Sequence, residues 1–282
     1  MGTSGAGADR RYRPLSGDER FAGWTEPRTW PGGSVSFGSV VDDLIDGVVA
    51  FASQPHESSY RRWSMPAAIG CVPWMSHERM TAALATLGGC CIVITKGAND
   101  LRAAQALHAN GQALPTVYLP GFDEVGLVRL DGHRPIIGPS GLAGESLAEL
   151  GPVRRAGWRG DRSAPLIHAK LLALGDAWGY DNDEDGEWGP QFRFRPCRAW
   201  LGSANWTQGA AEHLEFGLWV DEPQLVEHTF RFLLDLLKFS EPFDTANDHP
   251  NPELVDAEWD DAAFAEYLAN MGSPVDCDDE DS

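Results

Sequence analysis

Strand-like and helix-like patterns of hydrophobic residues alternate through the middle of the chain. Short apolar runs at 68–72 and 90–95 are typical of buried strands. Helical spacing occupies 78–87 between them and recurs at 101–109, before another strand-like run at 115–119. Alternation of this kind favours parallel strands covered by helices. We therefore expect an α/β fold with a mostly parallel central sheet flanked by helices.

Two more segments have the spacing of amphipathic helices that pack on the body. The first carries its apolar stripe on Val40, Val41, Leu44, Ile45, Val48, Val49 and Phe51. The second spans 225–237, with Phe230, Leu233, Leu234 and Leu237 in register. In both segments the stripe predicts a face that is buried in the core.

The composition divides the 282 residues into four parts. Residues 1–35 are rich in Gly, Arg, Pro and Trp, which indicates an irregular N-terminal arm. We expect 36–66 to be a helical segment packed on the body, and 67–240 to be the main domain. Residues 241–282 form an acidic extension whose end is predicted to be disordered.

The net charge of −20 is concentrated at the C-terminal end of the sequence. From Glu241 onward there are 14 Asp or Glu and no Lys or Arg, which leaves 28 acidic against 22 basic residues before it. Eight bases fall in one stretch: Arg154, Arg155, Arg159, Arg162, Lys170, Arg193, Arg195 and Arg198. They could form a local positive funnel for an anionic substrate, or an ordinary mixed surface, because seven acids share the same stretch.

Several classes of protein are disfavoured by what the sequence lacks. No apolar stretch is long enough to span a bilayer, and residues 1–11 lack the apolar segment of a signal peptide, so we expect a cytoplasmic protein without a membrane anchor. Five cysteines without paired spacing argue against a disulfide framework. Residues 181–186 match only the first half of a calcium loop, so we expect an acidic hairpin there, and we expect neither a metal nor a cofactor.

The chemistry-bearing residues fall in two short motifs. His168 and Lys170 lie two apart in an apolar run, 166–174, and in a strand they would share one face. Phosphoryl transfer needs a nucleophile or acid/base group together with fixed positive charge on the phosphate oxygens, and this pair supplies both. About thirty residues later, Ser203 and Asn205 can add neutral hydrogen bonds to the same phosphate. The pattern predicts a site that cleaves phosphodiesters.

These motifs resemble the signature of the phospholipase D superfamily, H-x-K followed by G-S-x-N. The matching positions are His168, Lys170, Gly202, Ser203 and Asn205. Asp176 falls one place later than the acidic residue of the family pattern, and Glu215 occupies the place of a Glu that supports the catalytic histidine in relatives. The resemblance extends from about 67 to 238 and implies that 67–240 is a phospholipase D-like catalytic domain.

The family mechanism, as the resemblance implies it, uses two histidines: one forms a phosphohistidine and the other protonates the leaving oxygen. This chain has one H-x-K motif, so we expect an obligate homodimer with one shared active site. The implied activity is a metal-independent phosphodiesterase, and the favoured function is a nuclease acting on DNA or RNA. The resemblance also extends to single-motif enzymes of bacterial defence and restriction systems. If this chain acts in such a system, partner proteins are expected as well.

Two other functions remain open at this point. One alternative is a phospholipid or small-phosphodiester hydrolase or transferase, and the other is a non-catalytic scaffold for which the shifted Asp176 is the hint.

The candidate substrate-binding residues are Gly202, Trp206, Arg193 and Arg195. Trp206 is the favoured base-stacking residue among the five tryptophans near the motifs, because it adjoins Asn205.

Overall fold

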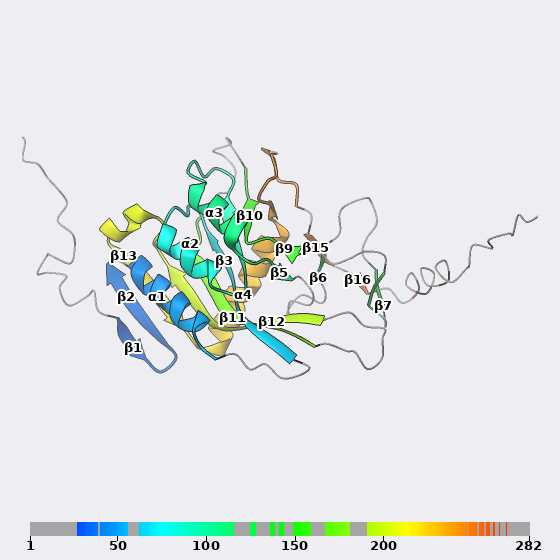
Figure 1. Cartoon of the computed structure of the whole chain (residues 1–282), viewed down its shortest axis with the longest axis horizontal. Coiled ribbons are helices and arrows are strands. Elements are labelled where there is room, and N and C mark those ends of the chain that lie inside the picture. Colours follow the sequence, from blue (N-terminus) through cyan, green and yellow to red (C-terminus); the bar gives the residue numbers. More distant parts are fainter. Residues whose placement is uncertain are drawn as a thin grey trace, which may run out of the picture.

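A mixed sheet forms the centre of the molecule. The computed structural model describes residues 27–38, 40–55, 62–115, 125–127, 136–138, 141–143, 149–158, 167–180, 191–246, 248–252, 254–256 and 258–259, with single positions at 262, 265 and 269. In this part of the chain nine strands lie side by side in the order β1-β2-β13-β12-β11-β3-β4-β10-β14 (Figure 1). In that order they are Arg28–Trp30, Gly33–Gly38, Glu215–Val220, Gln191–Gly202, Leu171–Tyr180, Arg62–Val72, Gly89–Thr95, Val153–Ala156 and Glu241–Pro242.

Three small sheets account for the remaining described strands. Their pairings are β5 (Leu114–Pro115) with β9 (Glu149–Leu150), β6 (Val125–Leu127) with β15 (Leu254–Asp256), and β7 (Ile136–Gly138) with both β8 (Gly141–Ala143) and β16 (Glu258–Trp259). The strand predicted at 115–119 corresponds only to the end of β5, and 116–119 lie outside the described residues.

The expectation of a mostly parallel sheet is wrong. Parallel pairing is confined to β3 with β4 and β4 with β10, whereas the other six pairings of the nine-stranded sheet are antiparallel. β3 and β4 of the alternating segment around 62–115 do pair in parallel, and β10 adds the second parallel pairing. The rest differs because β11, β12 and β13 follow one another as antiparallel neighbours, which needs no crossover helix.

Helices cover both faces of the sheet and produce two cores (Figure 1). Helices α1 (Val40–Ala52), α2 (Glu78–Ala85) and α3 (Arg102–Asn110) pack on one face, and α4 (Pro223–Lys238) packs on the other. All seven residues of β4 are buried, as expected for a strand covered on both sides. The helices predicted from hydrophobic spacing are confirmed, with ends shifted by a few residues.

A one-residue irregularity in β12 changes which core its side chains enter. Leu174 of β11 pairs with Arg198, but the next residue, Gly175, pairs with Pro196, so Cys197 is extra. Side chains in a regular strand alternate between faces, and an extra residue reverses that alternation. Phe194 accordingly lies in the α4 core, while Trp200, an even number of residues away, lies in the α1–α3 core.

Two local features hold the elements beside β13 in place. Glu222 caps α4, because its carboxylate accepts hydrogen bonds from the backbone N–H groups of Gln224 and Leu225 at 3.1 and 2.7 Å. In α1, a Cβ at Gly47 would lie 2.3 Å from the indole of Trp219, so glycine is what allows this helix to approach β13.

The predicted domain boundaries need correction at both ends of the body. Residues 28–30 and 33–38 form β1 and β2 of the large sheet rather than part of an irregular arm. β3 starts at Arg62, inside the segment expected to be helical, and β14 continues the sheet to Pro242, beyond the expected domain end. Composition could not place β1, β2 and β14, because they are short or glycine-rich. None of the described helices is long and apolar enough to cross a membrane.

A buried ion pair joins β14 to the end of β4. Lys96 Nζ lies 2.7 Å from Glu241 Oε1, and the two side chains are 2% and 0% exposed. The same ammonium donates to the carbonyl of His249 at 2.7 Å, and the same carboxylate oxygen accepts from the backbone N–H of Asn251 at 2.6 Å. The pair therefore ties the segment after α4 to the edge of the sheet.

We expect loss of either partner to be costly, because it leaves the other charge buried and unpaired. Lys96→Met or Glu241→Gln should each lower the free energy of unfolding by about 3 to 5 kcal/mol, whereas the double variant should lose clearly less than the two singles together. Urea denaturation measures this. The exposed Glu227–Arg231 pair is the control, and Glu227→Gln should change stability by less than about 1 kcal/mol. Additive single losses would contradict the prediction.

Candidate active site

The two sequence motifs meet at one edge of the large sheet. β11 begins at Leu171 and β12 ends at Gly202, and the register pairs Leu171 with Leu201. The backbone N–H of Gly202 then donates to the carbonyl of Lys170 at 3.1 Å. His168 and Lys170 lie just before β11, so the predicted strand over 166–174 starts later than expected. The antiparallel hairpin nevertheless brings the two motifs together.

The lysine and histidine of the first motif are in direct contact. Lys170 Nζ lies 3.1 Å from Nδ1 and 3.4 Å from Nε2 of His168, and it donates to the His168 carbonyl at 2.7 Å. An ammonium has only donors, so the ring nitrogen that faces it must act as acceptor. The ammonium is buried, whereas His168 is exposed. An exposed imidazole beside a fixed positive charge is suited to attack a phosphate.

Burial and a nearby carboxylate act in opposite directions on Lys170. Desolvation lowers the pKa of this ammonium, because removal from water penalises its charged form. The negative charge of Glu215 partly opposes that effect and raises the same pKa. Glu215 thus favours the charged form of Lys170.

Glu215 contacts Ser203 rather than His168. The Ser203 hydroxyl donates to Oε2 of Glu215, and its oxygen accepts from the backbone N–H of Phe216 at 3.0 Å. The other carboxylate oxygen lies 3.9 Å from Nδ1 of His213. The role expected for Glu215, support of the catalytic histidine, is not what this geometry provides. It instead orients Ser203 and faces the charge of Lys170.

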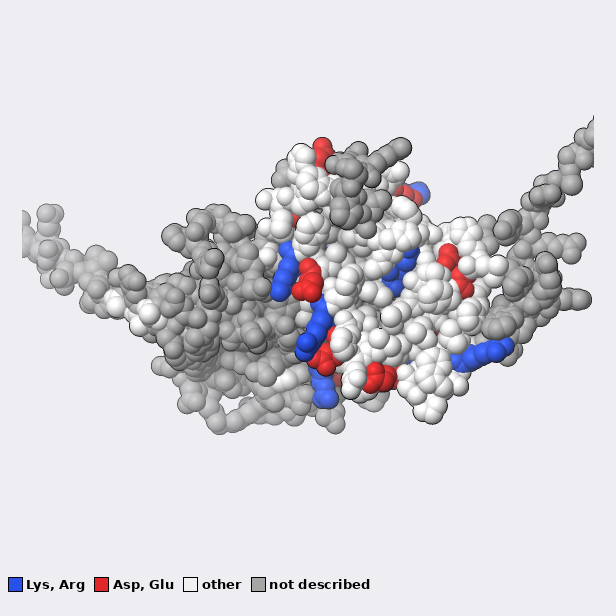
Figure 2. All heavy atoms as spheres, turned by 180° about the vertical axis from the view of Figure 1, so that it is seen from behind, with Lys and Arg blue, Asp and Glu red and all other residues white. Residues whose placement is uncertain are grey.

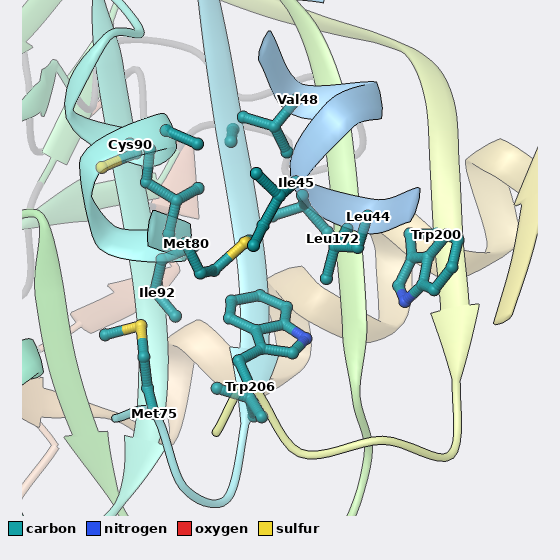
Figure 3. Close-up of a cluster of buried hydrophobic side chains, with 14 of the residues drawn as sticks. Leu44, Ile45, Val48, Met75, Met80, Cys90, Ile92, Leu172, Trp200 and Trp206 are labelled. Atoms are coloured by element: carbon teal, nitrogen blue, oxygen red, sulfur yellow. The ribbon is translucent and has the colours of Figure 1, made fainter. Parts of the chain in front are cut away.

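The second motif ends in a short loop that separates Asn205 from Trp206. Asn205 is partly exposed, and its Oδ1 is buried without a hydrogen-bond partner. Trp206 is fully buried in the α1–α3 core, where Figure 3 shows its indole near Met75 and Met80. This burial argues against the expectation that Trp206 stacks on substrate, because no part of its ring is accessible.

Asp176, Arg193 and Arg195 lie toward the far ends of the motif strands. Asp176 is six residues from Lys170 along β11, or about 20 Å at the rise of a strand. Arg195 pairs with Asp176 in register and is exposed, and the side chain of Arg193 is outside the described part of the chain. None of the three is brought to the edge that carries His168.

The described arginines of the basic stretch favour an ordinary mixed surface over a positive funnel. Arg154 donates to Ser240 at 2.7 Å and Arg155 to the Lys96 carbonyl at 2.8 Å, and both side chains are buried. Arg198 lies 3.0 Å from Asp221 and stacks 4.6 Å from the ring centroid of Trp219. On the face in Figure 2, acidic and basic side chains are interspersed over the described surface. Arg159 and Arg162 lie outside the described residues, as does the predicted acidic hairpin at 181–186.

The exposed aromatic residue Trp74 also lies at this edge, and the sequence did not predict it as a site residue. Trp74 follows β3, and 43% of its surface is accessible. The next residue, Met75, forms a parallel bridge with Trp206, which places the 74–77 segment beside the second motif. These two segments are more than 120 residues apart in sequence, so their contact cannot be predicted from the local sequence pattern. The one available signal was Pro73-Trp74 directly after an apolar run.

Comparison with known proteins gives similar solved structures but no sequence family. No family model matches the chain, and no curated protein matches significantly. NucT from Helicobacter pylori is 10% identical, with a TM-score of 0.43 over 75% of this chain and 99% of its own. Nuc from Salmonella typhimurium, described as a phospholipase D family member, is 13% identical, with a TM-score of 0.40 over 78% and 100%. A polyphosphate kinase from Porphyromonas gingivalis is 12% identical, with a TM-score of 0.39 over 77% and 27%.

The chain offers a direct test of the link between Lys170 and Glu215, since it contains only three lysines. We expect Glu215→Gln to lower the pKa of Lys170 further, because it removes the carboxylate that raises this pKa. Titration of ¹³C-labelled lysine side chains by NMR measures it. The control is Asp235→Asn, beside the partly exposed Lys238 and away from the site, which should leave the pKa of Lys170 unchanged. An unchanged or higher pKa in Glu215→Gln would contradict the assignment.

Proposed function

We propose that this protein is a phospholipase D-like phosphodiesterase, and specifically a nuclease that needs no metal. The observation that carries the proposal is the contact between the exposed imidazole of His168 and the buried ammonium of Lys170, beside the Ser203–Glu215 pair. A phosphodiester placed there meets a nucleophile, a fixed positive charge and the amide of Asn205. Those groups meet the main electrostatic needs of phosphoryl transfer.

The proposed reaction proceeds in two steps. A ring nitrogen of His168 attacks phosphorus, and the P–O bond to the leaving group breaks as the N–P bond forms. The leaving oxygen takes a proton from His168 of the partner subunit. That second imidazole then removes a proton from water, whose oxygen attacks phosphorus and breaks the N–P bond. The products are an alcohol and a phosphomonoester, and both imidazoles return to their starting state.

Two copies of the chain are required by this scheme, because each supplies one H-x-K motif. Apolar surface beside the site supports such an assembly. Leu214 and Phe216 flank Glu215 and are 60% and 46% exposed. Leu218 and its β2 partner Val35 are also partly exposed, and alternation along β13 places Leu218 on the same face as Phe216. We propose that a second copy covers this face of β13 and β2.

The chemistry is tested by cleavage assays in EDTA with labelled single-stranded and duplex DNA, RNA and phosphatidylcholine. We expect nucleic acid to be cleaved. His168→Ala should reduce the rate at least about 10³-fold, and Lys170→Met at least about 10²-fold, because they remove the nucleophile and the charge. The control His228→Ala, at an exposed histidine of α4, should change the rate by less than about twofold.

Activity that depends on added magnesium would refute the metal-free site. Cleavage of phosphatidylcholine alone would favour a lipid hydrolase, and cleavage of none of these substrates would favour a scaffold.

The shared site is tested by mixing subunits. The protein should sediment as a dimer, and equal amounts of wild type and His168→Ala, unfolded and refolded together, should keep about one quarter of the activity of an all-wild-type sample, since only wild-type pairs have both histidines. Phe216→Glu should weaken the dimer and lower activity at low protein concentration. A fully active monomer, or half activity in the mixture, would contradict the shared site.

A further inference from the structure

The segment between β3 and α2 is fixed against the second motif. Met75 pairs with Trp206 in a parallel bridge, and the backbone N–H groups of Ser76 and His77 both donate to the Trp206 carbonyl, at 2.9 and 3.1 Å. These bonds hold residues 74–77 beside the loop that carries Asn205. The position of Trp74 relative to the site is therefore set by the backbone.

Side-chain directions in this pair of segments can be read from burial. Met75 and Trp206 both enter the α1–α3 core, with 2% and 0% of their surface exposed (Figure 3). Neighbouring residues in extended backbone point to opposite sides, and paired segments lie about 4.8 Å apart. Trp74 and Asn205 precede the two bridged residues and so lie side by side, where Trp74 is exposed and Asn205 is partly exposed with its Oδ1 buried. The indole of Trp74 thus borders the place that a phosphate would occupy.

An exposed indole at this place has a ready chemical use. Tryptophan presents a large, rigid aromatic face, and stacking of an aromatic ring on a nucleobase is favourable for every base. Bases inside a duplex already have both faces covered, so only an unpaired base can offer its face to a protein ring. On the Ser203–Glu215 side of the site the exposed ring is Phe216, whose backbone N–H donates to Ser203, and it belongs to the face that we propose a second copy covers.

Resting on the proposed nuclease function, we propose that Trp74 is the stacking platform for an unpaired nucleobase next to the scissile phosphate. The substrate class of this site is accordingly single-stranded nucleic acid. Trp74 holds the strand while His168 and Lys170 act on the phosphate. The contact discriminates little among bases, because stacking uses the ring face and leaves the base edges unread.

Binding measured without catalysis separates this proposal from the reaction itself. In the His168→Ala protein, Trp74→Ala should weaken binding of a fluorescent single-stranded DNA oligonucleotide about 10-fold or more, whereas Trp74→Phe should restore most of the affinity. The same oligonucleotide with abasic sites throughout should bind weakly, and with equal affinity, to the His168→Ala protein with and without Trp74→Ala. Trp30→Ala is the matched control: Trp30 is 44% exposed, but it lies on β1, where it pairs with the end of β2 away from the site.

Three results would overturn the proposal. Unchanged single-strand affinity in Trp74→Ala would show that the indole does not contact the strand. An equal loss of affinity for blunt duplex DNA would show that it does not select unpaired bases, and a loss of dimer on sedimentation would show that it is a subunit contact. If the His168→Ala parent binds no nucleic acid and the wild type cleaves none, the nuclease function itself fails, which is a distinct outcome.

Discussion

The antiparallel pairing of β11 with β12 is the interaction on which the site depends. Its register places the residue before Leu171 beside the residue after Leu201, so the ends of two motifs that are some thirty residues apart in sequence become neighbours. The next pairing, β12 with β13, aligns Gly202 with Gly217 and brings Glu215 to Ser203. A slip of one residue in either pairing would turn the alternating side chains to the opposite face, so the chemistry depends on the same register as the core.

The charged and polar groups at this edge of the sheet stabilise one another. Lys170 loses hydration on burial, and it recovers favourable interactions from the carbonyl of His168 and the field of Glu215. Glu215 in turn is held by the hydroxyl of Ser203, which is fixed by the N–H of Phe216. Glu215 therefore links the two motifs, because it is held by Ser203 of the second and favours the charged form of Lys170 in the first.

The sequence predicted the helices and the two motifs well, because hydrophobic spacing and residue identity are local properties. It did less well wherever a distant partner decides the outcome. The antiparallel half of the sheet depends on β11, β12 and β13 pairing in order, and the extra residue at Cys197 shows only in their register. Arg154 and Arg155 looked like a basic surface but point inward, since sequence distance says nothing about direction. The burial of Trp206 and the exposure of Trp74 could not be predicted for the same reason, because both accompany a bridge between Met75 and Trp206 that joins distant segments.

The hairpin places its connection and its chemistry at opposite ends. β11 and β12 pair from Leu171 with Leu201 to Tyr180 with Gln191, and at about 3.3 Å per residue the two ends of the paired region lie about 30 Å apart. Residues inserted or removed beyond Tyr180 leave the register of the strands untouched, so the interval between the two motifs is free to drift during evolution. The same freedom is useful in engineering, since a reporter or binding module inserted there would leave the motif ends of the two strands in place.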